Sequence, residues 1–230
     1  MEKVVGRQSL HALLLTSAVI CILPLCSTAS SNPRELLRSG IDIHNKASLR
    51  RGVRLYMNYC ATCHSAKFMR FERLSEDLEM APEVVMTDLV RFGASKLSDT
   101  IPAAIDSETA EKSFGVAPPD LTLVAKYRGI DWVYSYLMGF YKDSSAPTGY
   151  NNHLLENVAM PWVMASLQEA SSEKEFSELM RDLTNFMAYM SEPVRPFRES
   201  FGKYVLGFLM ILLVSVRLLK NEYWRDMNEQ

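Results

Sequence analysis

Apolar residues recur at helical spacing in four parts of the chain, and this pattern predicts a mainly α-helical domain. One candidate helix covers 47–59, and a second covers 82–93, opened by a proline and closed by a glycine. A third is capped by Asp131 and covers 132–141. The last begins after Ser172 and places seven apolar residues on one face: Phe176, Leu179, Met180, Leu183, Phe186, Met187 and Met190.

The stretches between these helices are long and show no regular pattern, mainly at 94–117 and 144–161. No internal repeat or low-complexity tract is visible. A bound cofactor that contributes part of the core would explain how a chain with such long loops stays folded.

The N-terminus begins with basic residues, continues with an apolar run at 10–25 and ends in small residues. This order is typical of a secretory signal peptide, here 1–29 with cleavage near Ala29. The alternative is an uncleaved membrane anchor. In both cases the domain that follows, 30–200, is exported.

A second apolar segment lies near the C-terminus, at 204–219, flanked by basic and aromatic residues. Its length of about 16 residues gives roughly 24 Å of helix, slightly short of the usual span. Residues 201–219 are predicted to form one transmembrane helix, with a buried core helix as the alternative. The signal peptide then places the tail, 220–230, in the cytoplasm.

Charge is distributed unevenly along the chain. Residues 1–71 contain ten basic and three acidic residues, whereas residues 72–182 contain nine basic and 19 acidic residues, a net charge of −10. Such an acidic region argues against a nucleic-acid partner. It is either a solvated surface or a docking face for a basic partner protein.

The cysteines carry the clearest chemical signal. Two of the four, Cys21 and Cys26, lie in the N-terminal apolar run, and Cys60 and Cys63 lie in the motif Cys-Ala-Thr-Cys-His, which ends at His64. In c-type cytochromes the two thiols of this motif add to the vinyl groups of haem. On a helix the three side chains share one face, so the motif presents both attachment points and an iron ligand together.

Two other interpretations of the cysteine pair are weaker. A thioredoxin-like redox pair requires a strand-then-helix context in a βαβ sheet, which the pattern does not show. Zinc binding requires a second pair of ligands, and the remaining histidines are scattered: His11, His44 and His153.

An iron that only transfers electrons needs a sixth ligand, and a methionine in that position raises the reduction potential. Met160 is the best candidate among 13 methionines, because Pro161 biases it away from helix and so offers its side chain from a loop. Met164 is the second choice, and His153 is a further alternative. Most other methionines have helical spacing and are more simply core residues.

Several segments together resemble cytochrome c1, the haem subunit of the cytochrome bc1 complex, in its proteobacterial form. They cover nearly the whole chain after the signal: 47–52, 59–65, 114–121, 128–134, 140–141, 147–149, 157–161 and 220–226. The Pro-Pro-Asp-Leu element at 118–121 and the Met-Pro element at 160–161 are far more specific than the cysteine motif. A single C-terminal anchor is also the topology of this family.

The resemblance implies a fold and a set of residue roles. The expected fold is mainly α, a cytochrome c-like haem domain with long loops plus one C-terminal transmembrane helix. Cys60 and Cys63 would bind one haem c, with His64 and Met160 as axial ligands of the iron. The haem crevice and the propionates involve further residues: Pro118 and Pro119 in the crevice, and Arg128 or Lys126 with Trp132 near the propionates.

One departure from the family pattern is Ser113, where an aromatic residue is frequent. It is expected to change the local packing and to leave the ligands unaffected.

The resemblance also implies a function, in which the subunit accepts electrons from the Rieske iron–sulfur protein and passes them to a soluble or membrane-bound cytochrome c. Cytochrome b would be its membrane partner, and the haem domain would lie in the periplasm. The subunit breaks no substrate bond, so it is not an enzyme on its own. The alternatives are an anchored monohaem cytochrome serving another oxidase or dehydrogenase, and a haem enzyme or gas sensor with an open sixth position.

Overall fold

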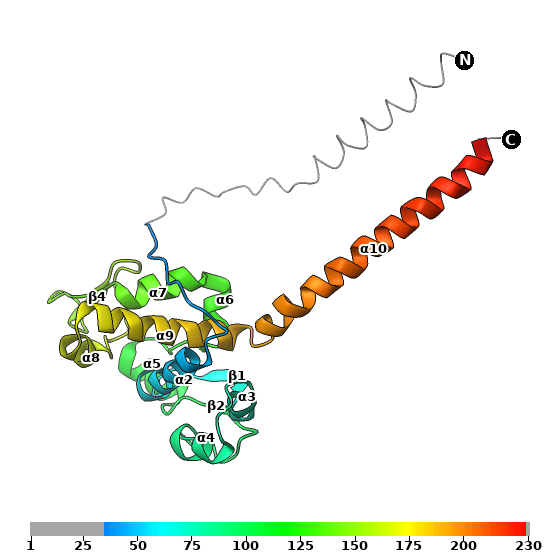
Figure 1. The fold of residues 1–230 in the computed structure, drawn as a ribbon. Coiled ribbons are helices and arrows are strands. Elements are labelled where there is room, and N and C mark those ends of the chain that lie inside the picture. The colour runs from blue at the N-terminus through cyan, green and yellow to red at the C-terminus, as the bar shows by residue number, and fades with distance from the viewer. Residues whose placement is uncertain (1–34, 229–230) are drawn as a thin grey trace. The chain divides into compact units, whose positions relative to one another are not determined.

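The structure of the protein is a computed structural model that describes residues 35–228 (Figure 1). The chain divides into two units, and the second, Leu36–Gln230, contains nearly all of the described residues. The predicted signal peptide, with Cys21 and Cys26, lies outside the described residues. The second unit is mainly α-helical, which confirms the expected fold class.

The elements of the second unit have the following bounds. The helices are α2 (Lys46–Leu55), the π-helix η1 (Tyr56–Cys60), α3 (Phe71–Asp77), α4 (Pro82–Asp88), α5 (Ser107–Phe114), α6 (Val124–Arg128), α7 (Ile130–Met138), α8 (Ala165–Ala170), α9 (Glu173–Ser191) and α10 (Arg195–Asn228). The strands are β1 (Ala66–Arg70), β2 (Thr100–Ile101), β3 (Phe140–Lys142) and β4 (Tyr150–Asn152). The described strands form two antiparallel pairs, β1 with β2 and β3 with β4.

Helix α9 is the central element of the domain, and it begins as the sequence predicts. The Ser172 hydroxyl and the Glu175 carboxylate each bond to the other residue's backbone amide, which makes a capping box. Six of the seven apolar residues predicted on one face are buried, and Leu179 is half-buried. The helix packs against α2, α6, α7 and α8, and in Figure 1 it runs between α7 and α2.

Helices α2 and α9 cross with their backbones in close contact at Gly52. A Cβ atom built on Gly52 would lie 2.2 Å from the Asp182 carbonyl oxygen and 2.7 Å from the Phe186 Cβ. Next to this contact, the Arg51 guanidinium binds the largely buried Asp182 carboxylate through two contacts of 2.5 and 3.0 Å. Only glycine permits this approach, so the crossing fixes the helix that leads into the cysteine motif.

Three predicted boundaries are wrong. Helix α4 ends at Asp88 because the amides of Leu89 and Val90 both bond to the Val85 carbonyl and close the helix before Gly93. Helix α7 begins at Ile130 and ends at Met138, and the residues after it form β3. The Asp131 carboxylate does not cap α7, because it accepts hydrogen bonds from the Ser39 amide and hydroxyl at 2.9 and 2.7 Å.

The stretch predicted to be irregular at 94–117 contains one strand and one helix, β2 and α5. The Asp106 carboxylate caps α5 by accepting from the Thr109 amide at 2.9 Å, and Gly115 ends the helix with a φ of 77°. The segment at 144–161 contains β4 and is otherwise irregular, close to the prediction.

The apolar C-terminal segment belongs to a longer helix than the sequence predicts. Helix α10 covers 34 residues, and it is the one helix within residues 35–228 that is long and apolar enough to cross a membrane. None of its most apolar window is buried in the protein, unlike the core helix considered as the alternative. Its exposed apolar surface is what a membrane-spanning helix presents to lipid.

The close helix crossing yields a prediction for Gly52→Ala. We expect this substitution to lower the free energy of unfolding of the full chain in detergent by about 3 kcal/mol, because the new methyl group overlaps the α9 backbone. Denaturant unfolding followed by circular dichroism measures this difference. Gly202→Ala in α10, where a Cβ atom meets nothing within 4 Å, is the matched control and should be neutral or slightly stabilising. Equal stability of the two variants would contradict the close crossing.

Candidate functional site

The cysteine motif follows a π-helical turn rather than an α-helical one. The Ala61 amide bonds to the Tyr56 carbonyl at 2.9 Å, which is the wide spacing of a π-helix. The helical path then resumes, with the His64 amide bonded to the Cys60 carbonyl at 2.8 Å. The predicted grouping of Cys60, Cys63 and His64 on one turn therefore agrees with the backbone, although the preceding turn is wider than expected.

The imidazole of His64 has a defined orientation. Its Nδ1 lies 2.7 Å from the Pro119 carbonyl oxygen, and because a carbonyl only accepts, Nδ1 carries the proton. Burial lowers the pKa of His64 below its usual value, although the Pro119 contact and the nearby Asp120 oppose the shift. A neutral ring protonated at Nδ1 directs an unshared pair from Nε2, which is the arrangement of a histidine that ligates a metal.

The Pro-Pro-Asp-Leu element is bonded directly to the residues that follow the cysteine motif. The Leu121 amide bonds to the Ser65 carbonyl at 2.9 Å. The Asp120 carboxylate accepts from the Ser65 hydroxyl at 2.8 Å, the Lys67 amide at 2.7 Å and the Thr122 amide at 3.0 Å. Burial alone would raise the pKa of Asp120, but hydrogen bonds, with Thr122 first among them, lower it overall.

A second segment is bonded to the cysteine motif itself. The amides of Ala104 and Ile105 bond to the carbonyls of Ala61 and Thr62, each at 3.1 Å. The turn between the two cysteines is thus held by backbone bonds from a segment about 40 residues later in the chain. The motif is a fixed turn and not a free loop.

The two thiols lack the features of a redox-active pair. Both are free, Cys60 is buried and Cys63 is half-buried. Burial raises the pKa of Cys60 to about 12 and also raises the pKa of Cys63. A thioredoxin-like nucleophile instead has a lowered pKa, and the described strands form no βαβ sheet. The thiol environment therefore disfavours this alternative.

Met160 lies half-buried in the loop after β4, as its position before a proline predicts. The Tyr136 hydroxyl donates to its sulfur at 3.7 Å, and burial raises the pKa of Tyr136 to about 12, so that hydroxyl keeps its proton. The alternatives lie elsewhere: Met164 is only 1% exposed in the core, and the ring of His153 stacks on Tyr141.

The two basic residues considered for the propionates have different surroundings. The Lys126 ammonium pairs with the Glu192 carboxylate at 3.1 Å. The Arg128 guanidinium lies 5.1 Å from the centre of the Trp132 ring. Arg128 and Trp132 also line a cavity of about 390 Å³ together with Leu36 and residues 39–41.

The structure thus groups the predicted residues in two clusters. One contains the cysteine motif, His64 and Pro119, and the other contains Arg128, Trp132 and Met160, with Tyr136 between the last two. Pro118 is half-buried next to Pro119. Lys126 forms an ion pair with Glu192. Sequence reasoning missed Tyr136, although its position four residues after Trp132 was a signal.

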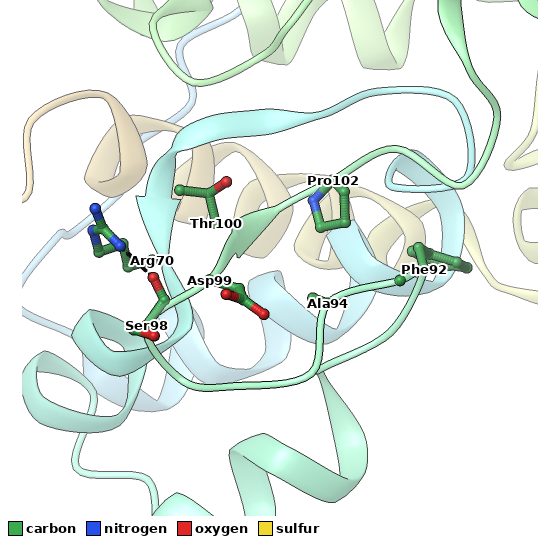
Figure 2. A pocket seen from close by; sticks show the side chains of 8 residues that line it. Arg70, Phe92, Ala94, Ser98, Asp99, Thr100 and Pro102 are labelled. Carbon is green, nitrogen blue, oxygen red and sulfur yellow. Dashed lines mark hydrogen bonds between the residues drawn. The ribbon is translucent and has the colours of Figure 1, made fainter.

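A larger cavity of about 570 Å³ is lined by residues of the loop between α4 and β2, together with Arg70 and Pro102 (Figure 2). Its lining contains none of the predicted site residues. Figure 2 shows Arg70 directed to the Ser98 carbonyl, and the Asp99 carboxylate accepts from the Ser95 and Lys96 amides. These polar groups hold the loop together.

Comparisons with known proteins agree with the resemblance drawn from the sequence. The model of the cytochrome C1 family matches residues 38–227. Cytochrome c1 of Allochromatium vinosum is 38% identical over 94% of this chain and 99% of its own length. The ammonia monooxygenase gamma subunit of Nitrosomonas europaea is also 38% identical, over 91% of this chain and 96% of its own length. A mitochondrial cytochrome c1 heme protein of Arabidopsis thaliana is 30% identical over 84% of this chain and 69% of its own length.

The bonds to Asp120 yield a prediction for Asp120→Asn. We expect the variant to be less stable than the wild type by about 1–3 kcal/mol at pH 7, because the amide cannot accept all the bonds that the carboxylate accepts. Denaturant unfolding at a series of pH values measures the difference.

The pH dependence of that difference has a defined sign. Because the pKa of Asp120 is lower in the folded state, its contribution is complete above its unfolded value, near 4, and is lost as the pH falls through the folded value. The two stabilities should therefore converge in acid. Glu111→Gln, on the exposed surface of α5, is the control and should change little. A constant difference between Asp120→Asn and the wild type at all pH values would contradict this assignment.

Proposed function

Because the chain belongs to the cytochrome c1 family, we propose that it is a membrane-anchored electron-transfer subunit with one covalently bound haem c. It would accept electrons from the Rieske iron–sulfur protein and pass them to a cytochrome c within a quinol–cytochrome c reductase. The observation that carries the proposal is the bond from His64 Nδ1 to the Pro119 carbonyl, directly after the cysteine pair.

The residues of the first cluster fit a covalent haem. Cys60 and Cys63 would hold it through thioether bonds, and their thiols, one buried and one half-buried, have raised pKa values that disfavour disulfide exchange. His64 would bind the iron through Nε2, because Nδ1 is occupied by Pro119. When bound, haem c supplies a one-electron couple between ferric and ferrous iron.

Met160 would also bind the iron, and a thioether ligand would favour its reduced state. Arg128 would bind the propionates in preference to Lys126, because Lys126 is paired with the Glu192 carboxylate whereas Arg128 contacts the Tyr127 hydroxyl and the Trp132 ring and no carboxylate among the contacts described. A guanidinium also binds a carboxylate through two parallel hydrogen bonds. The chain thus holds the haem, sets its potential and breaks no substrate bond, so it acts only as part of a complex.

The distribution of charge and apolar surface supports a location for each partner. Helix α10 exposes its apolar side chains and would cross the inner membrane beside cytochrome b. The haem domain would lie in the periplasm, as the predicted signal peptide requires, with the C-terminal tail in the cytoplasm. The acidic region at 72–182 would attract a basic cytochrome c and speed its encounter.

A second function is favoured by one specific observation. One relative of equal identity is named as the gamma subunit of an ammonia monooxygenase. That name supports a membrane-anchored monohaem cytochrome that serves another oxidase or dehydrogenase. The two functions share the haem site and differ in the proteins that surround it.

Purification of the full chain from its native membrane in mild detergent separates the two functions. We expect cytochrome b and an iron–sulfur protein to co-purify in constant ratio, together with quinol–cytochrome c reductase activity. Recovery of the haem protein with a different set of subunits and no cytochrome b would reject the reductase assignment in favour of the second function.

The ligand assignment yields a prediction for Met160→Leu. We expect the reduction potential of the full-length haem protein to fall, because the iron loses a thioether that favours its reduced state. A spectroscopic redox titration measures the change. Met164→Leu is the matched control, since Met164 is buried in the core and should alter the potential little. An unchanged potential in Met160→Leu, or a fall only in Met164→Leu, would reject Met160 as the ligand.

A further inference from the structure

The second cluster belongs to a continuous ladder of stacked side chains. The rings of Trp132 and Tyr136 are 5.2 Å apart at an interplanar angle of 8°, and the Arg128 guanidinium lies over the Trp132 ring. Tyr136 contacts Phe140 edge to face at 5.1 Å. The four residues of this series, Arg128, Trp132, Tyr136 and Phe140, are each four positions apart. Their side chains therefore lie along one side of the chain, from the end of α6 through α7 to the start of β3.

The ladder continues into the loop that carries Met160. Phe140 stacks on Trp162 at 4.1 Å and 11°, and Trp162 contacts Phe176 of α9 edge to face. The Trp162 indole also donates to the Gln168 side chain at 2.7 Å. Trp162, two positions after Met160, is therefore held by three other side chains, which restricts the loop beside Met160.

The Met160 sulfur is held separately, by the hydroxyl of Tyr136 at 3.7 Å. Tyr136 is itself fixed by ring contacts with Trp132 and Phe140, and its backbone carbonyl accepts from the Asn152 side chain at 2.7 Å. Asn152 is fully buried. The donor to the sulfur is thus a rigid group with little freedom to turn away.

We propose that Tyr136 is a positioning residue that orients the Met160 sulfur and raises the reduction potential through this hydrogen bond. The inference rests on the proposed function, in which Met160 ligates the haem iron. A thioether sulfur has two unshared pairs, and the bond from Tyr136 occupies one of them and leaves the other for the metal. The bond also withdraws electron density from the sulfur, which weakens its donation to ferric iron more than to ferrous iron.

Tyr136→Phe tests this inference in the full-length haem protein, because phenylalanine keeps the ring stack and removes only the hydroxyl. We expect the potential to fall, with the oxidised-to-reduced equilibrium shifting about three- to tenfold toward the oxidised form, where tenfold corresponds to about 59 mV. Haem content and the absorption spectrum of the reduced protein should stay those of the wild type, since the ligands are unchanged.

Two parallel variants make the outcome decisive. Tyr134→Phe removes a buried hydroxyl from the same helix and should leave the potential unchanged. Met160→Leu reports on the ligand itself.

A wild-type potential in Tyr136→Phe, together with a lowered potential in Met160→Leu, would overturn the role of Tyr136 and keep Met160 as the ligand. Equal shifts in Tyr136→Phe and Tyr134→Phe also overturn it, and an unchanged potential in Met160→Leu overturns both the ligand and this inference.

Discussion

The hydrogen bond from the His64 imidazole to the Pro119 carbonyl is the interaction on which the proposed site depends. It fixes the tautomer of His64 and so determines which ring nitrogen can bind iron. The residues that follow each partner are also hydrogen-bonded: the Ser65 hydroxyl donates to Asp120, and the Leu121 amide donates to the Ser65 carbonyl. Two segments separated by 55 residues are thereby joined, and in the proposed site a ligand held in this way would need little reorganisation when the iron changes its charge.

The rest of the domain serves to place that unit. The crossing of α2 and α9 at Gly52 fixes the helix that leads to the motif, and the π-helical turn at Tyr56–Cys60 carries the first cysteine. Such wide turns are frequent at functional sites because they redirect side chains without ending the helix. The buried Tyr56 hydroxyl then donates to the His64 carbonyl at 3.2 Å, which ties the turn to the motif.

Much of this arrangement could be predicted from the sequence, and the reasons are physical. Strong periodicity and a capping box identified α9, and the cysteine motif and the Met-Pro element indicated the candidate ligands. The end of α4 and the start of α7 were predicted wrongly, because they depend on how backbone amides and the Asp131 carboxylate are bonded in the folded chain, in part to residues as distant as Ser39. Short-range patterns carry no information about such contacts. The role of Asp120 as the group that joins Ser65, Lys67 and Thr122 could likewise be seen only in three dimensions.

The proposed function requires that Cys60 and Cys63 hold one haem covalently beside a ligating His64. Denaturing gel electrophoresis of the full chain, stained for haem and combined with the haem-to-protein ratio, tests this requirement most directly. We expect one haem per chain that stays with the polypeptide after denaturation and extraction with acid and organic solvent, and that is lost from the double variant with Cys60→Ala and Cys63→Ala. Haem that leaves the wild-type chain under those conditions, or remains bound to the double variant, would contradict the covalent attachment.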